Sequence, residues 1–336
     1  MTRIFSNKLT AKIIFITLIL FILTVFNSIA SEDKIDFVIG SASPGSTGYI
    51  HWEACSYLAI KYSPNLNCSS ISTSGSTEDT LLLEQNKIQL GHGTSLDVVS
   101  AWAGKDPFKN KIEVWQALPW TFWAQPLVTL AKYDDLKTYY DLEGKAISLI
   151  KKGSGTESMY SILLEEYGLL DKVNKNYLSF DDSKDALIDG LIFAFPTNFS
   201  GGKEPPVLAQ LALQDPYKIL ESDIEVLKKT NERNRGIIIV NLPKESSEFL
   251  KEDILVPGLG GIGLTSADVS DEAIYQFVKA VLEHTDELHE ISSVSDATTL
   301  EYSASSFMPG YPVHPGAAKY FKEKGLWDED LIIGER

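Results

Sequence analysis

Three stretches of glycine and small hydroxylated residues stand where strand-like sequence turns into helix-like sequence. They are residues 43–49 (SPGSTGY), 73–76 (TSGS) and 153–156 (GSGT). A helix start offers unpaired backbone N–H groups and the positive end of the helix dipole, and Ser and Thr side chains add further hydrogen bonds. Together, the three loops predict a binding site for an anion or a carboxylate.

A second interpretation of these loops is purely structural. Residues 76–79 (STED) and 154–157 (SGTE) both fit the S-x-x-[DE] capping box, in which the serine side chain already has its hydrogen bond. Any one loop could therefore be only a helix start. The recurrence of the pattern at three junctions favours a binding cleft.

Motifs for catalysis or cofactor binding are absent from the sequence. The glycines at 40, 45 and 48 do not fit G-x-G-x-x-G, and there is no P-loop, no G-x-S-x-G and no H-E-x-x-H. A serine hydrolase built on Ser46 or Ser154 would need a base, for which His92 is a loose candidate. We therefore expect a non-enzymatic protein with no catalytic residue, no metal and no cofactor.

The elements that must position these loops alternate between strand and helix. The patterns predict strands at 36–39, 69–73, 89–91, 146–150 and 191–195, and helices at 49–62, 77–86, 95–103, 156–167 and 271–284. Such alternation predicts an α/β fold with a mostly parallel sheet. Ligands of open α/β sheets lie beyond the carboxyl ends of the strands, where the three loops are expected.

A long aromatic segment at 114–132, interrupted by prolines, separates two such α/β units. It is typical of a crossover between lobes, and a chain of 336 residues exceeds the size of a usual single core. Trp120 and Trp123 in this segment could line the cleft or belong to the core or hinge.

The N-terminus has the pattern of a secretory signal peptide. Three basic residues precede the uncharged apolar run at 13–26, and small residues before position 31 predict cleavage after Ala30. An uncleaved membrane anchor is the alternative, although the run is short for a membrane span. We expect an exported, periplasmic protein.

The charge of the chain limits its partners. Removing residues 1–30, which carry three basic and no acidic side chains, takes the formal net charge from −16 to −19. Nucleic acids and anionic membranes require basic patches, so neither is expected as a partner. A small anionic ligand in a recessed site remains compatible with this charge.

Two cysteines, Cys55 and Cys68, are present in the chain. In an oxidising compartment, one disulfide closing a short loop is expected between them, with two buried free thiols as the alternative.

Four segments resemble the TAXI family of solute-binding proteins, which serve tripartite ATP-independent periplasmic (TRAP) transporters. They are FVIGSASPGSTGYIHW (37–52), STSGSTEDTLLLEQNKIQLGHGTSLDVVSAWAGKDPF (72–108), DLEGKAISLIKKGSGTESMYSILLEEYGL (141–169) and HPGAAKYFKEKGLW (314–327). The D-L-x-G-K…G-S-G-T segment and the terminal H-P-G-A helix are the most specific. The first loop departs from the family pattern at 42–44, where Ala-Ser-Pro replaces glycine or small positions.

The resemblance implies a two-lobe, type II periplasmic binding protein fold with a ligand cleft between the lobes. Lobe 1 is expected at 31–130 plus 256–336, and lobe 2 at 131–255. The ligand-facing positions that carry over are Thr47, Tyr49, Ser74, Ser76, Thr94, Ser154, Gly155 and Thr156. We add Ser43 from the first loop and Trp120 from the crossover.

The function that the resemblance implies is capture of a small organic solute, a carboxylate or an amino acid, and its delivery to TRAP membrane permease subunits. We expect a monomer for this role. Two alternatives keep the same fold: a binding protein of an ATP-driven importer, or a sensor. An exported serine hydrolase is the alternative from another class.

Overall fold

The computed structural model describes residues 34–336, and the expected signal peptide lies outside this described part. Its strands are β1 (Ile35–Gly40), β2 (Leu66–Ile71), β3 (Leu90–Thr94), β4 (Val114–Ala124), β5 (Leu127–Leu130), β6 (Ala146–Ser148), β7 (Asn174–Asn176), β8 (Phe195–Pro196), β9 (Phe199–Ser200), β10 (Tyr217–Ile219), β11 (Ile237–Leu242) and β12 (Ile254–Ser266). Its α-helices are α2 (Thr47–Tyr62), α3 (Ser76–Glu84), α4 (Ser95–Ala103), α5 (Gly155–Glu166), α6 (Phe180–Ile188), α7 (Pro206–Ala212), α8 (Ile224–Arg233), α9 (Asp271–Leu282), α10 (Thr285–Ile291), α11 (Leu300–Ser305) and α12 (Pro315–Glu323). Short 3-10 helices lie at η1 (Tyr139–Leu142), η2 (Lys244–Ser246) and η3 (Ser293–Ser295).

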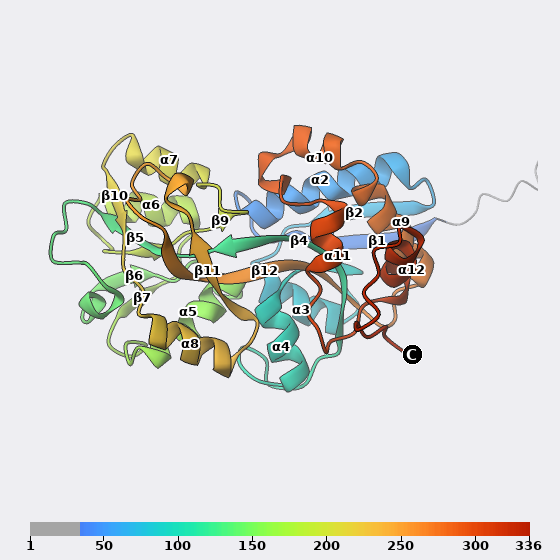
Figure 1. The fold of residues 1–336 in the computed structure, drawn as a ribbon, viewed down its shortest axis with the longest axis horizontal. Coiled ribbons are helices and arrows are strands. Elements are labelled where there is room, and N and C mark those ends of the chain that lie inside the picture. Colours follow the sequence, from blue (N-terminus) through green and yellow to red (C-terminus); the bar gives the residue numbers. More distant parts are fainter. Residues whose placement is uncertain (1–33) are drawn as a thin grey trace, which may run out of the picture. The chain divides into compact units, whose positions relative to one another are not determined.

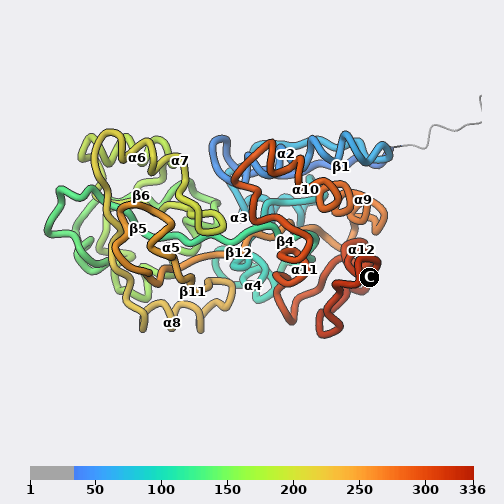
Figure 2. Tube along the Cα trace, turned by 45° about the horizontal axis from the view of Figure 1, so that its top comes forward, coloured from blue at the N-terminus to red at the C-terminus, as the bar shows by residue number. Residues whose placement is uncertain are grey.

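Two long strands, β4 and β12, join two lobes (Figure 1). Strands β1–β3 with α2–α4 and α9–α12 surround one end of this pair, and β5–β8, β10 and α5–α8 surround the other. Figure 2 shows the same division in a second orientation. The expected two-lobe α/β fold is confirmed, while the lobe boundaries at 130/131 and 255/256 stay a prediction.

The larger sheet is mixed. Its order is β2-β1-β3-β12-β4-β9, with β11 also paired to β12. Strands β1 and β3 run parallel, whereas β12 is antiparallel to β3, β4 and β11. The expectation of a mostly parallel sheet is therefore wrong, because the chain crosses to the second lobe on β4 and returns in the opposite direction on β12.

Each lobe has its own apolar core. The first includes Leu83, Ile88, Val98, Phe108, Ile262 and Leu264. The second includes Val128, Leu187, Phe195, Leu208, Tyr217 and Val256. Two such cores allow the lobes to pack independently on either side of a shared boundary. Along the chain from residue 34 onward, no helix is long and apolar enough to cross a membrane.

Glycines in β12 allow tryptophan rings to lie directly on this strand. A Cβ on Gly263 would lie 2.7 Å from the Trp52 ring, and one on Gly261 would lie 2.8 Å from the Trp123 ring. A side chain at either position would push the ring away. The positions of the Trp52 and Trp123 rings therefore depend on these two glycines of β12.

The predicted strand at 191–195 is confirmed only in its second half. Leu191 is 68% exposed, and the β8 strand begins only at Phe195. Leu191 still belongs to the turn that follows α6, where its backbone N–H donates to the carbonyl of Ala186. Phe193 and Ala194 already pair with β6, because the Phe193 N–H donates to the Ala146 carbonyl at 2.7 Å and Ala194 forms a parallel bridge with Ile147. A short apolar run cannot distinguish this turn from a buried strand.

The expected disulfide is not formed. Cys55 and Cys68 are both free and buried. The Cys55 thiol lies 3.3 Å from Nε2 of His51, and the Cys68 thiol lies 3.5 Å from the Ser56 hydroxyl. Each sulfur therefore contacts a polar neighbour on α2, and the alternative of two buried thiols describes the structure.

Candidate functional site

A polar cavity lies between the two lobes, with a volume of about 40 Å³. The first lobe contributes the loop before α2, the loop before α3 and the end of β3. The second lobe contributes the loop before α5 and the start of α6, and Trp123 and Leu259 come from the two crossing strands. The lining residues are Ala42, Ser43, Ser46, Thr47, Gly48, Ser74, Gly75, Ser76, His92, Thr94, Trp123, Gln125, Ile150, Ser154, Gly155, Thr156, Phe180, Asn198 and Leu259.

Four helices, α2, α3, α4 and α5, begin at this cavity. Three of them are capped by a hydroxyl that also lines the cavity. Ser46 accepts from the N–H of Tyr49, Thr94 from that of Asp97 and Ser154 from that of Glu157. The capping interpretation of these loops is thus correct for Ser154, and the helix starts still direct their remaining N–H groups and positive dipole ends to one place.

Helix α3 departs from the expected capping box. Its N-cap is Gly75, which offers no side chain, and Ser76 is already inside the helix. The Ser76 hydroxyl is fully buried and lines the cavity. It makes no hydrogen bond of full geometry within residues 34–336, and its neighbour is the buried Asp97 carboxyl, whose raised pKa the hydroxyl partly offsets. A buried hydroxyl without a partner costs free energy, so this group is available to a ligand.

The second and third loops contact each other across the cleft. Gly75 has a φ of +138°, and a Cβ there would lie 3.1 Å from Cα of Ser154. The N–H of Glu78 donates to the carbonyl of Gly153 at 3.4 Å, and the hydroxyls of Thr77 and Ser158 are 3.2 Å apart. These contacts hold the lobes together on one side of the cavity.

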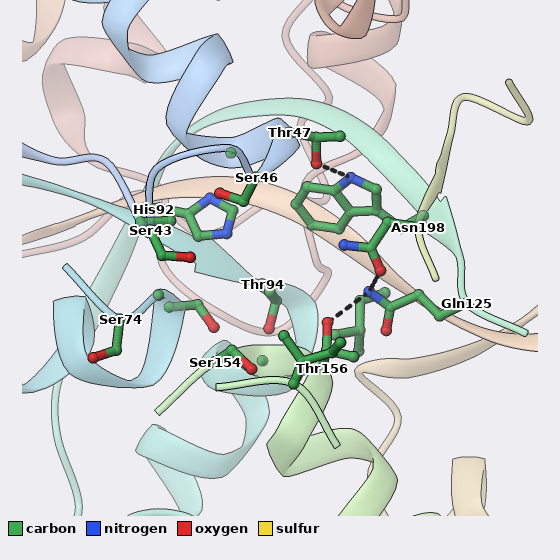
Figure 3. Close-up of a pocket in the computed structure, with 18 of the residues that line it drawn as sticks. Ser43, Ser46, Thr47, Ser74, His92, Thr94, Gln125, Ser154, Thr156 and Asn198 are labelled. Carbon is green, nitrogen blue, oxygen red and sulfur yellow. Dashed lines mark hydrogen bonds between the residues drawn. The ribbon is translucent and has the colours of Figure 1, made fainter. Parts of the chain in front are cut away.

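Two amide side chains and an indole complete the polar wall (Figure 3). Nε2 of Gln125 donates to Oγ1 of Thr156 at 3.1 Å and to Oδ1 of Asn198 at 2.7 Å. Nε1 of Trp123 donates to Oγ1 of Thr47 at 3.1 Å. Because the Thr47 oxygen accepts here, its own proton remains free for a ligand.

His92 presents a neutral ring to the cavity. Nε1 of Trp52 donates to its Nδ1 at 3.0 Å, so the ring proton must be on Nε2. Burial lowers the pKa of His92 to about 4, and the ring is uncharged at neutral pH. His92 therefore acts as a hydrogen-bond donor rather than as a cation.

The cavity wall contains no Lys, Arg, Asp or Glu among the described residues. Two buried carboxyls lie behind it. Asp97 accepts from the N–H and hydroxyl of Thr94, and Asp79 accepts from the N–H of His92. Burial raises the pKa of both carboxyls. Hydroxyls, amides and helix starts are thus the groups that meet a ligand.

Most of the expected ligand-facing residues lie together in this cavity. Ser43, Thr47, Ser74, Ser76, Thr94, Ser154, Gly155 and Thr156 line it. Tyr49 is not among the lining residues. Trp120 is fully buried and stacks on His51, with ring centroids 3.8 Å apart.

Sequence reasoning did not single out Gln125 or Asn198, and it left His92 and Trp123 among the alternatives. Gln125 follows the long apolar strand β4 and precedes a proline, which is a polar interruption that could have marked it. Asn198 follows another proline-containing apolar run, and no local pattern connects it with Gln125, 73 positions away. Within the described residues, no three His, Cys, Asp or Glu side chains gather as metal ligands.

Comparison with solved structures supports the fold. The chain is similar to a protein from Bordetella bronchiseptica RB50, with 15% identity, coverage of 89% of this chain and 91% of that chain, and a TM-score of 0.51. It is also similar to XAC2383 from Xanthomonas citri bound to ATP, with 9% identity, 87% and 96% coverage and a TM-score of 0.50. The alkanesulfonate-binding protein SsuA from Xanthomonas axonopodis pv. citri, bound to MOPS, matches at 16% identity, 89% and 96% coverage and a TM-score of 0.46.

A family comparison gives the more specific result. The NMT1-like family matches residues 39–325, which include every residue of the polar cavity. This match supports the expected solute-binding class, whereas the narrower TAXI assignment is not what the comparison returns. The chain therefore belongs to the NMT1-like family, a family of periplasmic solute-binding proteins.

Proposed function

We propose that this chain captures a small organic carboxylate or amino acid outside the cytoplasm and delivers it to the membrane permease of an ATP-driven importer. The class is established by the family: its members bind solutes and are not enzymes. The observation that carries the ligand chemistry is the convergence of four helix starts on a cavity without charged side chains.

The donors around the cavity suit a carboxylate. Helix N-termini favour a negative charge by about 0.3–1 kcal/mol each in exposed settings, and more when partly buried. The Ser76 hydroxyl and the ring N–H of His92 add further donors to the cavity wall. A carboxylate accepts several such bonds without requiring an arginine.

The cavity also contains one acceptor without a partner. Oε1 of Gln125 is buried and makes no hydrogen bond within residues 34–336. A ligand that carries an ammonium or hydroxyl group beside its carboxylate would satisfy this oxygen. Amino acids and hydroxy acids therefore belong in the ligand class.

Two transport partners are compatible with a binding protein of this fold. The family match supports the ATP-driven importer, one of the two alternatives that the sequence leaves on the same fold. The TAXI-like segments keep a TRAP-type permease as the second candidate. Uptake into vesicles that contain the partner permease distinguishes them: dependence on internal ATP supports the importer, and dependence on an ion gradient alone supports the TRAP permease.

A thermal-shift screen of the purified chain against carboxylates and amino acids tests the ligand class. A ligand at 100 times its Kd is expected to stabilise the protein by about 2.7 kcal/mol, which gives a clear rise in Tm. The fully amidated forms of the same compounds, in which every carboxylate is a primary amide, serve as matched controls that lack the carboxylate charge. A panel in which no carboxylate or amino acid raises the Tm would contradict the proposal.

A further inference from the structure

A second cavity, which we call the annex, opens beside the polar cavity. It is lined by Gly45, Ser46, Thr47, Ile50, Phe180, Asp181, Thr197, Asn198, Pro205, Pro206, Val207, Gln210 and Val294. Four of these residues, Ser46, Thr47, Phe180 and Asn198, also line the polar cavity. The two cavities therefore share a wall at the start of α2 and at the facing edge of the second lobe.

The annex differs from the polar cavity in the chemistry of its wall. Ile50 lines it from α2, Val207 from α7 and Val294 from η3, and Phe180 and two prolines also belong to its wall. Its charged lining residue within the described chain is Asp181, which lies exposed at α6. Such a wall accepts uncharged carbon groups and disfavours a second carboxylate.

The two adjoining cavities favour a ligand with two chemically different parts. The polar cavity has a volume of about 40 Å³, and the annex has about 180 Å³. The annex is therefore the larger of the two spaces. Because the two cavities share a wall, the annex is the adjoining space into which a ligand extends from the polar cavity.

One buried polar group in the annex is also without a partner. Thr197 is fully buried, lines the annex, and its hydroxyl makes no hydrogen bond in the part of the chain that the structure describes. Its neighbour Asn198 belongs to both cavities. This hydroxyl, like that of Ser76 in the polar cavity, is positioned to meet a ligand atom.

We infer that the ligand is an amphiphilic carboxylate, whose head occupies the polar cavity and whose uncharged chain or ring occupies the annex. The inference rests on the proposed function and narrows it, because short or doubly charged acids would leave the annex empty or place a charge against apolar side chains. Ile50, Phe180 and Val294 then select the ligand by the size and shape of its apolar part.

Straight-chain carboxylates from acetate to octanoate test the inference by isothermal titration calorimetry. Each methylene that enters the annex is expected to tighten binding about fourfold until the annex is filled. Hexanol serves as the control for the head group and is expected to bind more weakly than hexanoate.

A matched pair of variants on one helix tests the role of the annex wall. Ile50 lines the annex and is 38% exposed, whereas Ile60 lies on the same helix α2, is 58% exposed and lines neither cavity. Ile50→Asn is expected to reduce the gain in affinity per methylene to about twofold or less, because the variant replaces one apolar side chain of the annex wall by a polar one. Ile60→Asn is expected to show the same dependence of affinity on chain length as the wild type.

The outcomes separate the inference from the proposed function. Binding that improves with chain length in the wild type and Ile60→Asn, but not in Ile50→Asn, supports the inference. Binding of carboxylates without any dependence on chain length, or with the same dependence in both variants, overturns the inference and leaves the proposed function standing. No binding by any carboxylate or amino acid overturns both.

Discussion

The indole N–H of Trp52 donates to Nδ1 of His92 at 3.0 Å, and this bond fixes the tautomer of the histidine that lines the polar cavity. Both residues are buried: Trp52 is fully inaccessible and His92 is 9% exposed. An indole nitrogen can only donate, so Nδ1 can only accept, and Nε2 carries the proton. Trp52 thus acts on the site through His92, as a positioning residue.

The variant Trp52→Phe removes the donor and keeps an aromatic ring. We expect the two tautomers of His92 to mix and its pKa to rise from about 4, because the neutral form loses a hydrogen bond. Imidazole ¹⁵N shifts measure both effects. Trp102→Phe is the matched control, since the indole of Trp102 donates to the Val114 carbonyl, far from His92. A protonated Nδ1 in the wild type would contradict this account.

Stability at acid pH provides a second prediction. The native pKa of His92 is about 4, while an unfolded histidine has a pKa of about 6.5. Between these values the unfolded chain binds a proton that the native ring does not, so this group stabilises the fold above pH 6.5 and loses its contribution as the pH falls to 4. The slope for this one group is at most about 1.4 kcal/mol per pH unit.

The variant His92→Gln isolates that contribution. Its free energy of unfolding is expected to fall less steeply than that of the wild type between pH 6.5 and 4.5, as measured by denaturant titration. The comparison cancels the other buried titratable groups, including His314, whose pKa burial also lowers to about 4. Equal slopes for the two proteins would show that the native ring titrates like an unfolded one.

The hydroxyls of the cavity divide into those that hold the fold and those free for a ligand. Ser154 caps α5, so Ser154→Ala is expected to destabilise the protein by about 1 kcal/mol. The hydroxyl of Ser76 makes no hydrogen bond of full geometry within residues 34–336, and Ser76→Ala is expected to keep or slightly raise the Tm while carboxylate affinity falls about fivefold.

Ser303→Ala is the control for Ser76→Ala. Its hydroxyl is also buried without a partner in residues 34–336, but it lies outside both cavities. Ser303→Ala is expected to have the same Tm as Ser76→Ala, but to bind carboxylates with the affinity of the wild type. A large drop in Tm for Ser76→Ala would place its hydroxyl in the fold instead.

The two cysteines provide a chemical test of the structure. Burial raises the pKa of the Cys68 thiol to about 11 and that of Cys55 well above its usual value, so neither thiol is reactive in the native protein. Without reductant, iodoacetamide is expected to modify both thiols after denaturation and neither before, as counted by mass spectrometry. If the denatured protein were alkylated only after reduction, the result would show that Cys55 and Cys68 form a disulfide and would contradict the structure with two free thiols.

The sequence predicts this fold best where local chemistry agrees with tertiary packing. Helix α4 occupies the expected residues 95–103, because Thr94 and Asp97 form a capping box and Gly104 ends the helix in the left-handed region. The run at 191–195 is predicted only in part, because Ala194 and Phe195 pair with neighbouring strands whereas Leu191 faces solvent after the end of α6. Its pattern is the same for a turn as for a strand.

The residues of the candidate site likewise fall into those that local sequence predicts and those that depend on tertiary contacts. Residues in the three loops could be predicted, because a helix start carries its signature in four or five consecutive residues. The pair of Gln125 and Asn198 could not, since their contact exists only after β4 crosses to the second lobe. The annex could not be predicted for the same reason: its wall combines α2, α6, α7 and η3.

The most direct test of the account is calorimetric binding of acetate, hexanoate, 2-oxoglutarate and glutamate to the purified chain at pH 7, each beside the form in which every carboxylate is replaced by a primary amide. The account predicts that at least one carboxylate binds, and binds about tenfold more tightly than its amide, because the helix starts and free hydroxyl donors favour the charged head. Equal binding of the acid and the amide, or no binding of any acid, would contradict it.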